Sequence, residues 1–210
     1  MKHLRYKEGL PLVEYLALEQ QLVATAEEPS LFTWIVAPTV IYGRHQSAEA
    51  EVNEAYCRAH GIQVVQRKSG GGCVYADEGN LMISYILPAS FGNAAEAYER
   101  FLSILAQALQ EAGLPAVTTA HNDVLVNGRK VSGTASYTTP AGTIVHGTLL
   151  FDVHIDRMLQ AITPSADKLN KHGVASVRQR VANIRELTER FKDIHELRTY
   201  IETFFIQYNG

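Results

Sequence analysis

The sequence predicts an α+β fold in which a mixed, mainly antiparallel sheet is flanked by helices. Apolar residues recur at helical spacing in residues 11–28 and 94–112. Asn127-Gly128 stands between two apolar runs, which is typical of a hairpin because both central positions of the favoured turn need a positive φ. The helices and hairpins do not alternate strictly, so a parallel-sheet fold is not expected.

The individual elements follow from local patterns, taken in chain order. Helices are expected at residues 11–28, 49–60, 94–112, 155–162 and 193–207. Pro11 suits the first turn of the first helix, and Gly61 and Gly113 end the second and third. Strands are expected at residues 31–36, 40–43, 62–66, 80–87, 123–126, 130–137 and 143–153. Strand 80–87 is apolar on both faces, so we expect it to be buried on both sides.

Composition limits the class of protein. The 210 residues are 46% hydrophobic and carry a net charge of -3, which is typical of one soluble domain and gives no reason to expect nucleic acid or a membrane as partner. The N-terminus lacks an apolar signal core, so a cytoplasmic location is expected. Cys57 and Cys73 are then expected to be free thiols. Histidines and cysteines do not cluster at ligand spacing, and we predict no metal site built by the protein alone.

A basic, glycine-rich segment is the first candidate site. Residues 67–75 read Arg-Lys-Ser-Gly-Gly-Gly-Cys-Val-Tyr and lie between two apolar runs. Taken alone, such a segment most often forms a tight turn between strands. The functional interpretation is an anion site, in which backbone N–H groups and the charges of Arg67 and Lys68 face a phosphate or carboxylate. The spacing fits neither a P-loop nor a dinucleotide fingerprint.

A second group of polar residues surrounds the predicted hairpin. Asn122-Asp123 precedes it, and Lys130-Val131-Ser132-Gly133 begins its second strand. Alternation predicts Lys130 on the face opposite Val131 and Gly133. Lys130 could be a solvated edge charge or a cation held against an acyl phosphate, for which its small neighbours leave room. His146 has a structural and a catalytic interpretation as well.

Five segments in order resemble the lipoate–protein ligase A family of the biotin/lipoate ligase superfamily. They are Trp34 with residues 43–46 (Gly-Arg-His-Gln), residues 67–80, Asn122-Asp123 with residues 130–133, residues 146–152 (His-Gly-Thr-Leu-Leu-Phe-Asp) and residues 171–178 (Lys-His-Gly-Val-Ala-Ser-Val-Arg). The resemblance covers about residues 11–187 and implies a class II synthetase-like catalytic domain. It also implies an ATP-dependent ligase that forms lipoyl-adenylate and then transfers the lipoyl group to a lysine of an acceptor protein.

The resemblance implies roles for individual residues. Lys130 would be the catalytic residue, in contact with the lipoyl carboxyl and the α-phosphate. ATP would be held by Lys130 together with Arg67, Gly72, Cys73, Val74, Tyr75, Asn80, Asn122 and Asp123. Lipoate would be held by Lys130 together with Ser69, Gly70, Gly71 and His146, with an apolar tunnel for its tail. Mg²⁺ accompanying ATP would lie at Asp123. The acceptors would be lipoyl domains of 2-oxoacid dehydrogenase complexes and the glycine-cleavage H protein.

Alternatives remain at this point. An octanoyl or lipoyl transferase would act without ATP through a cysteine thioester. One transferase branch carries that cysteine after an Ile-x-Pro element, but this chain reads Ile162-Thr163-Pro164-Ser165, so a ligase is favoured. A biotin ligase and a non-catalytic lipoate- or acceptor-binding protein are weaker alternatives.

Many family members have a C-terminal accessory domain that is absent from residues 1–210. Whether the core acts alone, needs a separate accessory chain or is a fragment stays open.

Overall fold

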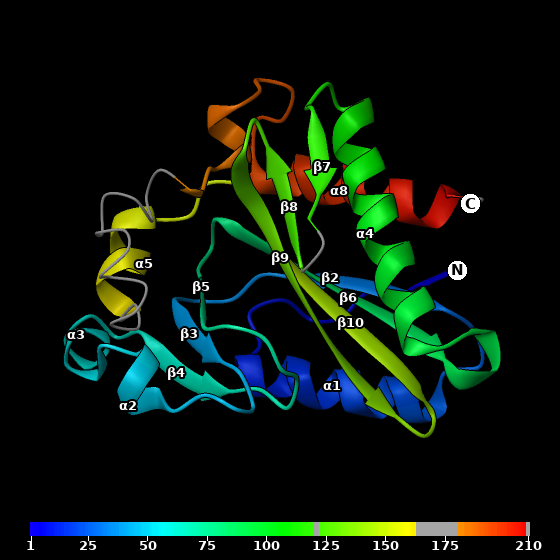
Figure 1. Ribbon diagram of the computed structural model, residues 1–210, viewed down its shortest axis with the longest axis horizontal. Coiled ribbons are helices and arrows are strands. Elements are labelled where there is room, and N and C mark those ends of the chain that lie inside the picture. The colour runs from blue at the N-terminus through cyan, green and yellow to red at the C-terminus, as the bar shows by residue number, and fades with distance from the viewer. Residues whose placement is uncertain (120–121, 163–179, 209–210) are drawn as a thin grey trace.

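A seven-stranded sheet forms the centre of the protein (Figure 1). The computed structural model describes residues 1–119, 122–162 and 180–208. From edge to edge the strands are β1 (Lys2–His3), β2 (Ser30–Trp34), β6 (Asn80–Pro88), β10 (Gly142–Leu150), β9 (Arg129–Thr139), β8 (Asp123–Val126) and β7 (Ala116–Thr118). Only the β1–β2 pair of this sheet is parallel. The prediction of a mixed, mainly antiparallel sheet is therefore confirmed.

Helices cover both faces of this sheet (Figure 1). Helices α4 (Ala94–Glu111) and α8 (Ile194–Gln207) pack on one face, and α1 (Leu12–Thr25) packs on the other. Strand β6 separates the two layers: Leu81 and Ile83 join the core under α4 and α8, whereas Met82 joins the core under α1. Every residue of β6 is buried, which confirms the expectation that it is covered on both sides.

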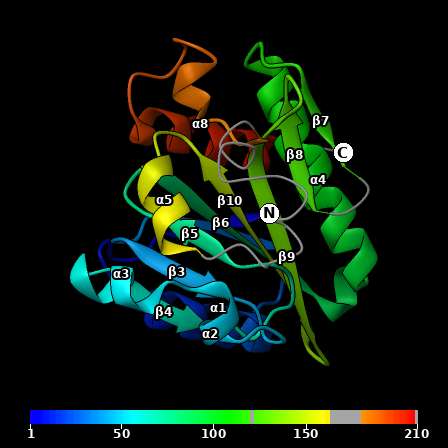
Figure 2. The same cartoon turned by 60° about the vertical axis from the view of Figure 1, so that its left-hand side comes forward.

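A smaller sheet lies beside the large one (Figure 2). Its strands are β4 (Gln63–Gln66), β3 (Thr39–Tyr42) and β5 (Val74–Ala76), in that order. Helices α3 (Glu54–Ala59) and α5 (Ile155–Ala161) contribute Cys57, Met158 and Ala161 to the hydrophobic cluster beneath it. The adjacent strands predicted at 31–36 and 40–43 therefore belong to different sheets, and the glycine segment connects β4 to β5.

The single helix predicted at residues 49–60 is wrong. The chain forms two short helices there, α2 (Ala48–Glu51) and α3, and Val52 between them is extended and pairs with Ile162. Asn53 then caps α3 by accepting a hydrogen bond from the Tyr56 N–H at 3.1 Å. A β-branched residue followed by a strong N-cap residue marks this break in the sequence. The short elements β1, β7, η1 (Ala89–Phe91) and η2 (Ile184–Glu186) were also not predicted.

The predicted hairpin forms with one irregularity that repositions Lys130. Asn127 and Gly128 have φ values of 52° and 74°, which confirms the turn. Val124 pairs with Ser132 but Leu125 pairs with Lys130, so Val131 is an extra residue on β9. Such a β-bulge interrupts the alternation of side chains. The prediction that Lys130 and Gly133 lie on opposite faces is wrong, because a Cβ on Gly133 would lie 2.8 Å from Lys130 Nζ.

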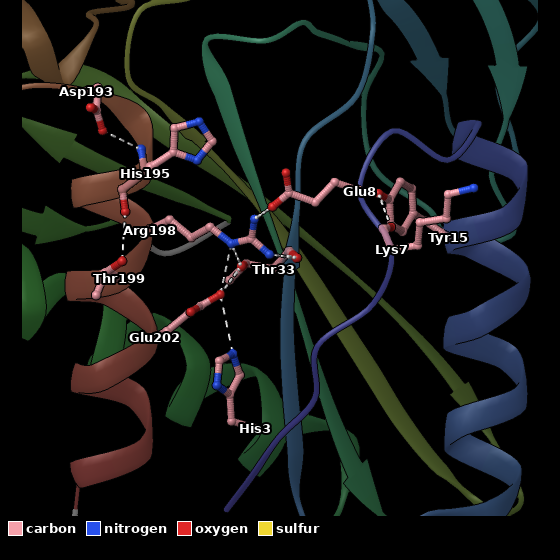
Figure 3. Close-up of polar contacts among 10 residues, drawn as sticks. All are labelled: His3, Lys7, Glu8, Tyr15, Thr33, Asp193, His195, Arg198, Thr199 and Glu202. Atoms are coloured by element: carbon pink, nitrogen blue, oxygen red, sulfur yellow. Dashed lines mark hydrogen bonds and ion pairs between the residues drawn. The ribbon is translucent and has the colours of Figure 1, made fainter.

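A polar cluster ties α8 to β2 and the N-terminal segment (Figure 3). The Arg198 guanidinium donates to the Thr33 carbonyl at 3.0 Å and to Glu202 Oε1 at 3.0 Å, and it also pairs with Glu8. Glu202 accepts a further hydrogen bond from the Thr33 hydroxyl and lies 3.3 Å from His3 Nε2. No helix in the described part of the chain combines the length and apolar character that crossing a bilayer requires.

Candidate active site

A cavity of about 350 Å³ lies between α1, the glycine segment and strands β6, β9 and β10. Eight of the predicted site residues line it: Arg67, Gly71, Gly72, Cys73, Val74, Asn122, Lys130 and His146. Apolar side chains complete its wall, namely Leu12, Leu16, Trp34, Ile41 and Met82. The cavity thus combines a cationic group with an apolar wall, which suits a ligand with a charged head and an aliphatic tail. A larger, more open groove between α4 and β7 contains none of the predicted residues.

Arg67 organises the glycine segment. The guanidinium is almost fully buried, and all three of its nitrogens donate hydrogen bonds. Their acceptors are the Ile41, Gly70 and Gly72 carbonyls and the Ser69 hydroxyl. Burial lowers the pKa of Arg67, and the nearby Cys73 partly offsets this. Arg67 therefore holds the segment's backbone from inside, which was not foreseen; its contact with ATP stays a prediction.

The conformation of the glycine segment depends on Gly71. Its φ of +88° is one that residues with side chains rarely adopt, whereas a Cβ on Gly70 or Gly72 would meet nothing within 4 Å. With this turn, Gly71, Gly72 and Cys73 face the cavity together. The segment continues into strand β5 and not into a helix.

Lys130 and Asp123 form an ion pair beside the cavity. Lys130 Nζ lies 2.7 Å from Asp123 Oδ1, and each side chain is about a third exposed. The bulge in β9 and the missing side chain of Gly133 create the space that Lys130 Nζ occupies. The sequence predicted both residues in the site, and the structure brings them into direct contact.

Ser69 and His146 extend the site through a buried polar chain. The Ser69 hydroxyl lies 2.7 Å from His146 Nε2, and His146 Nδ1 lies 3.1 Å from Glu19 Oε2. Glu19 in turn accepts a hydrogen bond from the Ser84 hydroxyl at 2.6 Å. Glu19 and Ser84 were not predicted as site residues from the sequence. The signal for Glu19 is a carboxylate on the apolar face of α1, four residues after the buried Tyr15.

Several predicted residues lie outside the cavity wall. Ser69 lines a neighbouring cavity of about 250 Å³, while Tyr75 and Asn80 are buried and do not line the first cavity. The buried Asn80 Oδ1 has no hydrogen-bond partner among the described residues. Gly70 and Asp123 flank residues that line the first cavity. The predicted marker at 171–178 and Ser165 lie outside the described residues.

Asp123 is a carboxylate beside the cavity that fits a Mg²⁺ borne by a nucleotide. Within the described ranges, no group of three or more His, Cys, Asp or Glu could hold a metal ion. Mg²⁺ commonly binds one or two carboxylates together with substrate phosphates and water. Asp123 offers one carboxylate, whereas Asn80 is fully buried and does not line the cavity. One carboxylate can complete the shell of an ion that arrives with ATP.

Solved structures with the same architecture define the class of fold. A crystal structure of lipoate-protein ligase A bound with ATP aligns with a TM-score of 0.82 at 22% identity, covering 97% of this chain and 83% of that chain. A bi-partite lipoate protein ligase from Thermoplasma acidophilum, described with its E2 lipoyl domain, aligns with a TM-score of 0.81 at 24% identity, covering 95% and 83%. The fold is that of the lipoate ligase catalytic domain, which confirms the predicted fold class.

Sequence comparison identifies the family. A family model described as the lipoyl protein ligase A/B catalytic domain matches residues 11–206. Lipoate-protein ligase LplJ of Bacillus subtilis is 37% identical over 188 residues, which are 89% of this chain and 56% of that protein. The chain belongs to the lipoyl protein ligase A/B catalytic domain family, as its resemblance indicated. It spans a little over half the length of the curated relatives it matches.

Proposed function

We propose that this chain activates lipoate with ATP, forming lipoyl-adenylate, and transfers the lipoyl group to a lysine of an acceptor lipoyl domain. The observation that carries the proposal is the position of Lys130: it lines an apolar-walled cavity together with Gly71, Gly72 and Cys73 of the glycine segment. An ammonium group can then meet a carboxylate and a phosphate in one place. The ligase names of the curated relatives support this choice of substrate.

In the first step the lipoate carboxylate attacks the α-phosphate of ATP. A bond forms between a carboxylate oxygen and the α-phosphorus, and the bond to the departing pyrophosphate breaks. Negative charge grows on the phosphoryl oxygens, where the Lys130 ammonium and the backbone N–H groups of Gly72 and Cys73 would stabilise it. The apolar wall, which includes Trp34 and Met82, would hold the aliphatic tail. Asp123 would hold the Mg²⁺ that accompanies ATP, and this ion would neutralise part of the charge of the phosphates.

In the second step the neutral amine of the acceptor lysine attacks the acyl carbonyl. An amide bond forms, the bond between the acyl carbon and AMP breaks, and the amine's proton leaves to solvent. Lys130 would stay close to the acyl group throughout, because a compact ammonium on a flexible stem can follow a small movement. The Thermoplasma ligase described with its E2 lipoyl domain supports an acceptor of this kind. The glycine-cleavage H protein is proposed as a second acceptor.

Lipoate-dependent exchange of labelled pyrophosphate into ATP tests the first step directly. The wild-type chain is expected to catalyse it, and Lys130→Ala is expected to lower its rate by at least about a hundredfold, since one charge-stabilising group typically contributes that much. Lys192→Ala, which removes an exposed lysine far along the chain, is the matched control and keeps the wild-type rate. Unchanged exchange in Lys130→Ala would overturn the proposed role of this residue.

Two further assays separate this function from its alternatives. Acyl transfer from octanoyl-carrier protein without ATP would assign a transferase instead, and binding of lipoate without either reaction would assign a binding protein.

A burst of lipoyl-adenylate from the isolated chain would show that the core acts alone. Adenylation that starts only after a second chain is added would assign a bi-partite ligase, the description given to the Thermoplasma protein.

A further inference from the structure

Among the described residues, the buried carboxylate of Glu19 on α1 has no lysine or arginine beside it. Glu19 is 2% exposed, and within the described ranges no Lys or Arg lies within ion-pair distance of it. Burying a carboxylate is costly unless it is hydrogen-bonded or paired. Its partners are the Ser84 hydroxyl at 2.6 Å and His146 Nδ1 at 3.1 Å. The mechanism proposed above does not use Glu19, although His146 lines the cavity.

Glu19 and His146 lie in the middle of a series of hydrogen bonds that runs from Trp34 to Arg67. The direction of each bond can be assigned because the group at either end of the series can only donate. Trp34 Nε1 can only donate, and it contacts the Ser84 hydroxyl at 2.8 Å. Ser84 therefore directs its own proton to Glu19. Since an ionised carboxylate only accepts, the proton between Glu19 and His146 resides on Nδ1.

The same reasoning applies from the other end. Arg67 Nε can only donate, and it contacts the Ser69 hydroxyl at 3.0 Å. Among the described residues, the Ser69 hydroxyl has one further partner, His146 Nε2 at 2.7 Å. Its proton is satisfied only if Nε2 is unprotonated. The Glu19 end places a proton on Nδ1, and the Ser69 end leaves Nε2 without one. Together they indicate a neutral His146 with its proton on Nδ1.

We propose that Glu19 is a positioning residue: it holds His146 in this tautomer, and His146 thereby fixes Ser69 and the glycine segment opposite Lys130. His146 and Leu16 line both the main cavity and the neighbouring cavity of about 250 Å³. An imidazole without its carboxylate partner could turn toward either space. Glu19 therefore keeps the wall between the two cavities in one arrangement. The kinetic part of this inference rests on the proposed function, and the spectroscopic part does not.

Nitrogen NMR of ¹⁵N-histidine-labelled protein reads the tautomer without any substrate. The wild-type protein is expected to show His146 neutral with its proton on Nδ1. In Glu19→Gln, Ser84 can still donate to the amide oxygen, so the amide NH₂ faces Nδ1 and the proton is expected to move to Nε2. Glu14→Gln, the same change at an exposed position of α1, is the matched control. A wild-type His146 protonated on Nε2 would overturn the proposal, whatever the variants do.

Kinetics test the consequence for the site. Glu19→Gln is expected to lower kcat/KM for the carboxylic acid substrate by about 10- to 100-fold, because a network hydrogen bond of this kind is lost. Ser69→Ala added to Glu19→Gln is expected to cost little more, since Glu19 acts on Ser69 through His146. Additive effects, or an unchanged tautomer in Glu19→Gln, would overturn the proposal. A wild-type chain that shows the expected tautomer but no adenylation would instead contradict the proposed function.

Discussion

Lys130 Nζ lies 2.7 Å from Asp123 Oδ1, and Gly133 leaves the space in which they meet. The ammonium of Lys130 occupies the side of β9 on which a Gly133 side chain would stand, because Val131 is bulged out of the ladder. Asp123 begins the neighbouring strand β8. The position of the proposed catalytic lysine is thus set by a backbone irregularity, a missing side chain and one carboxylate, and each can be tested separately.

Gly133→Ala tests the missing side chain. The added Cβ would lie 2.8 Å from Lys130 Nζ and 3.0 Å from its Cε, so the lysine must move while the backbone need not. We expect pyrophosphate exchange to fall about tenfold to a hundredfold, because small displacements of a reacting group are costly. The melting temperature should change little, since the end of a flexible side chain can shift. Adding Gly133→Ala to Lys130→Ala should have no further effect on exchange; a further loss would contradict this account.

Asp123→Asn tests the carboxylate. Both side chains of the pair are about a third exposed, so its loss should change the free energy of unfolding by no more than about 1 kcal/mol. Adenylate formation should fall about tenfold, because Lys130 loses its anchor and Mg²⁺ loses a proposed ligand. Glu186→Gln, which removes the exposed pair between Arg129 and Glu186, is the matched control. Equal exchange rates in the two variants would exclude a role for Asp123.

Cys73→Ser separates the ligase from a thioester mechanism. Cys73 lines the cavity, but the proposed mechanism needs only its backbone. We expect lipoyl transfer to stay within about threefold of wild type, since a similar small side chain faces the same space. The other thiol, Cys57, is buried, and burial followed by the charge of Glu54 raises its pKa, so it cannot readily replace Cys73 as nucleophile. A loss of transfer together with a trapped acyl-enzyme in the wild type would indicate the transferase instead.

Acid stability should depend on Glu202. Burial raises the pKa of this carboxyl, but hydrogen bonds from Thr33 and Arg198 and the charges of His3 and Arg198 outweigh burial, so the net shift is downward (Figure 3). A carboxyl with a lowered folded pKa stabilises the protein above its unfolded pKa of about 4.3, and this contribution is lost as pH falls through the folded pKa. We expect Glu202→Gln to destabilise the protein by about 1–3 kcal/mol at neutral pH.

The measurement is urea unfolding at a series of pH values. Below a pH of about 4.3 the wild type should lose stability more steeply than Glu202→Gln, and the two curves should converge. Glu99→Gln, at an exposed position of α4, is the control and should follow the wild type throughout. Parallel curves for wild type and Glu202→Gln would show that Glu202 does not titrate with folding.

Patterns that depend on neighbouring residues were predicted from the sequence, whereas contacts between distant segments were not. The Asn127-Gly128 turn and the doubly buried strand β6 follow from local chemistry and are confirmed. The bulge at Val131 reverses the side of Lys130, and simple alternation cannot foresee it. Motif resemblance brought Arg67 and Lys130 into the site, but not the burial of Arg67 beneath its own loop. Glu19 was missed because its partners come from segments more than sixty residues away.

The site lies where three parts of the fold meet. Lys130 stands on the sheet that packs against α4 and α8, the glycine segment leaves the small sheet, and Glu19 belongs to α1. A molecule bound in the cavity would therefore contact α1, the glycine segment and β9 at the same time. Binding to the folded state alone raises stability with the logarithm of ligand concentration. Substrate binding should therefore raise the melting temperature of the domain, by a shift that grows with ligand concentration.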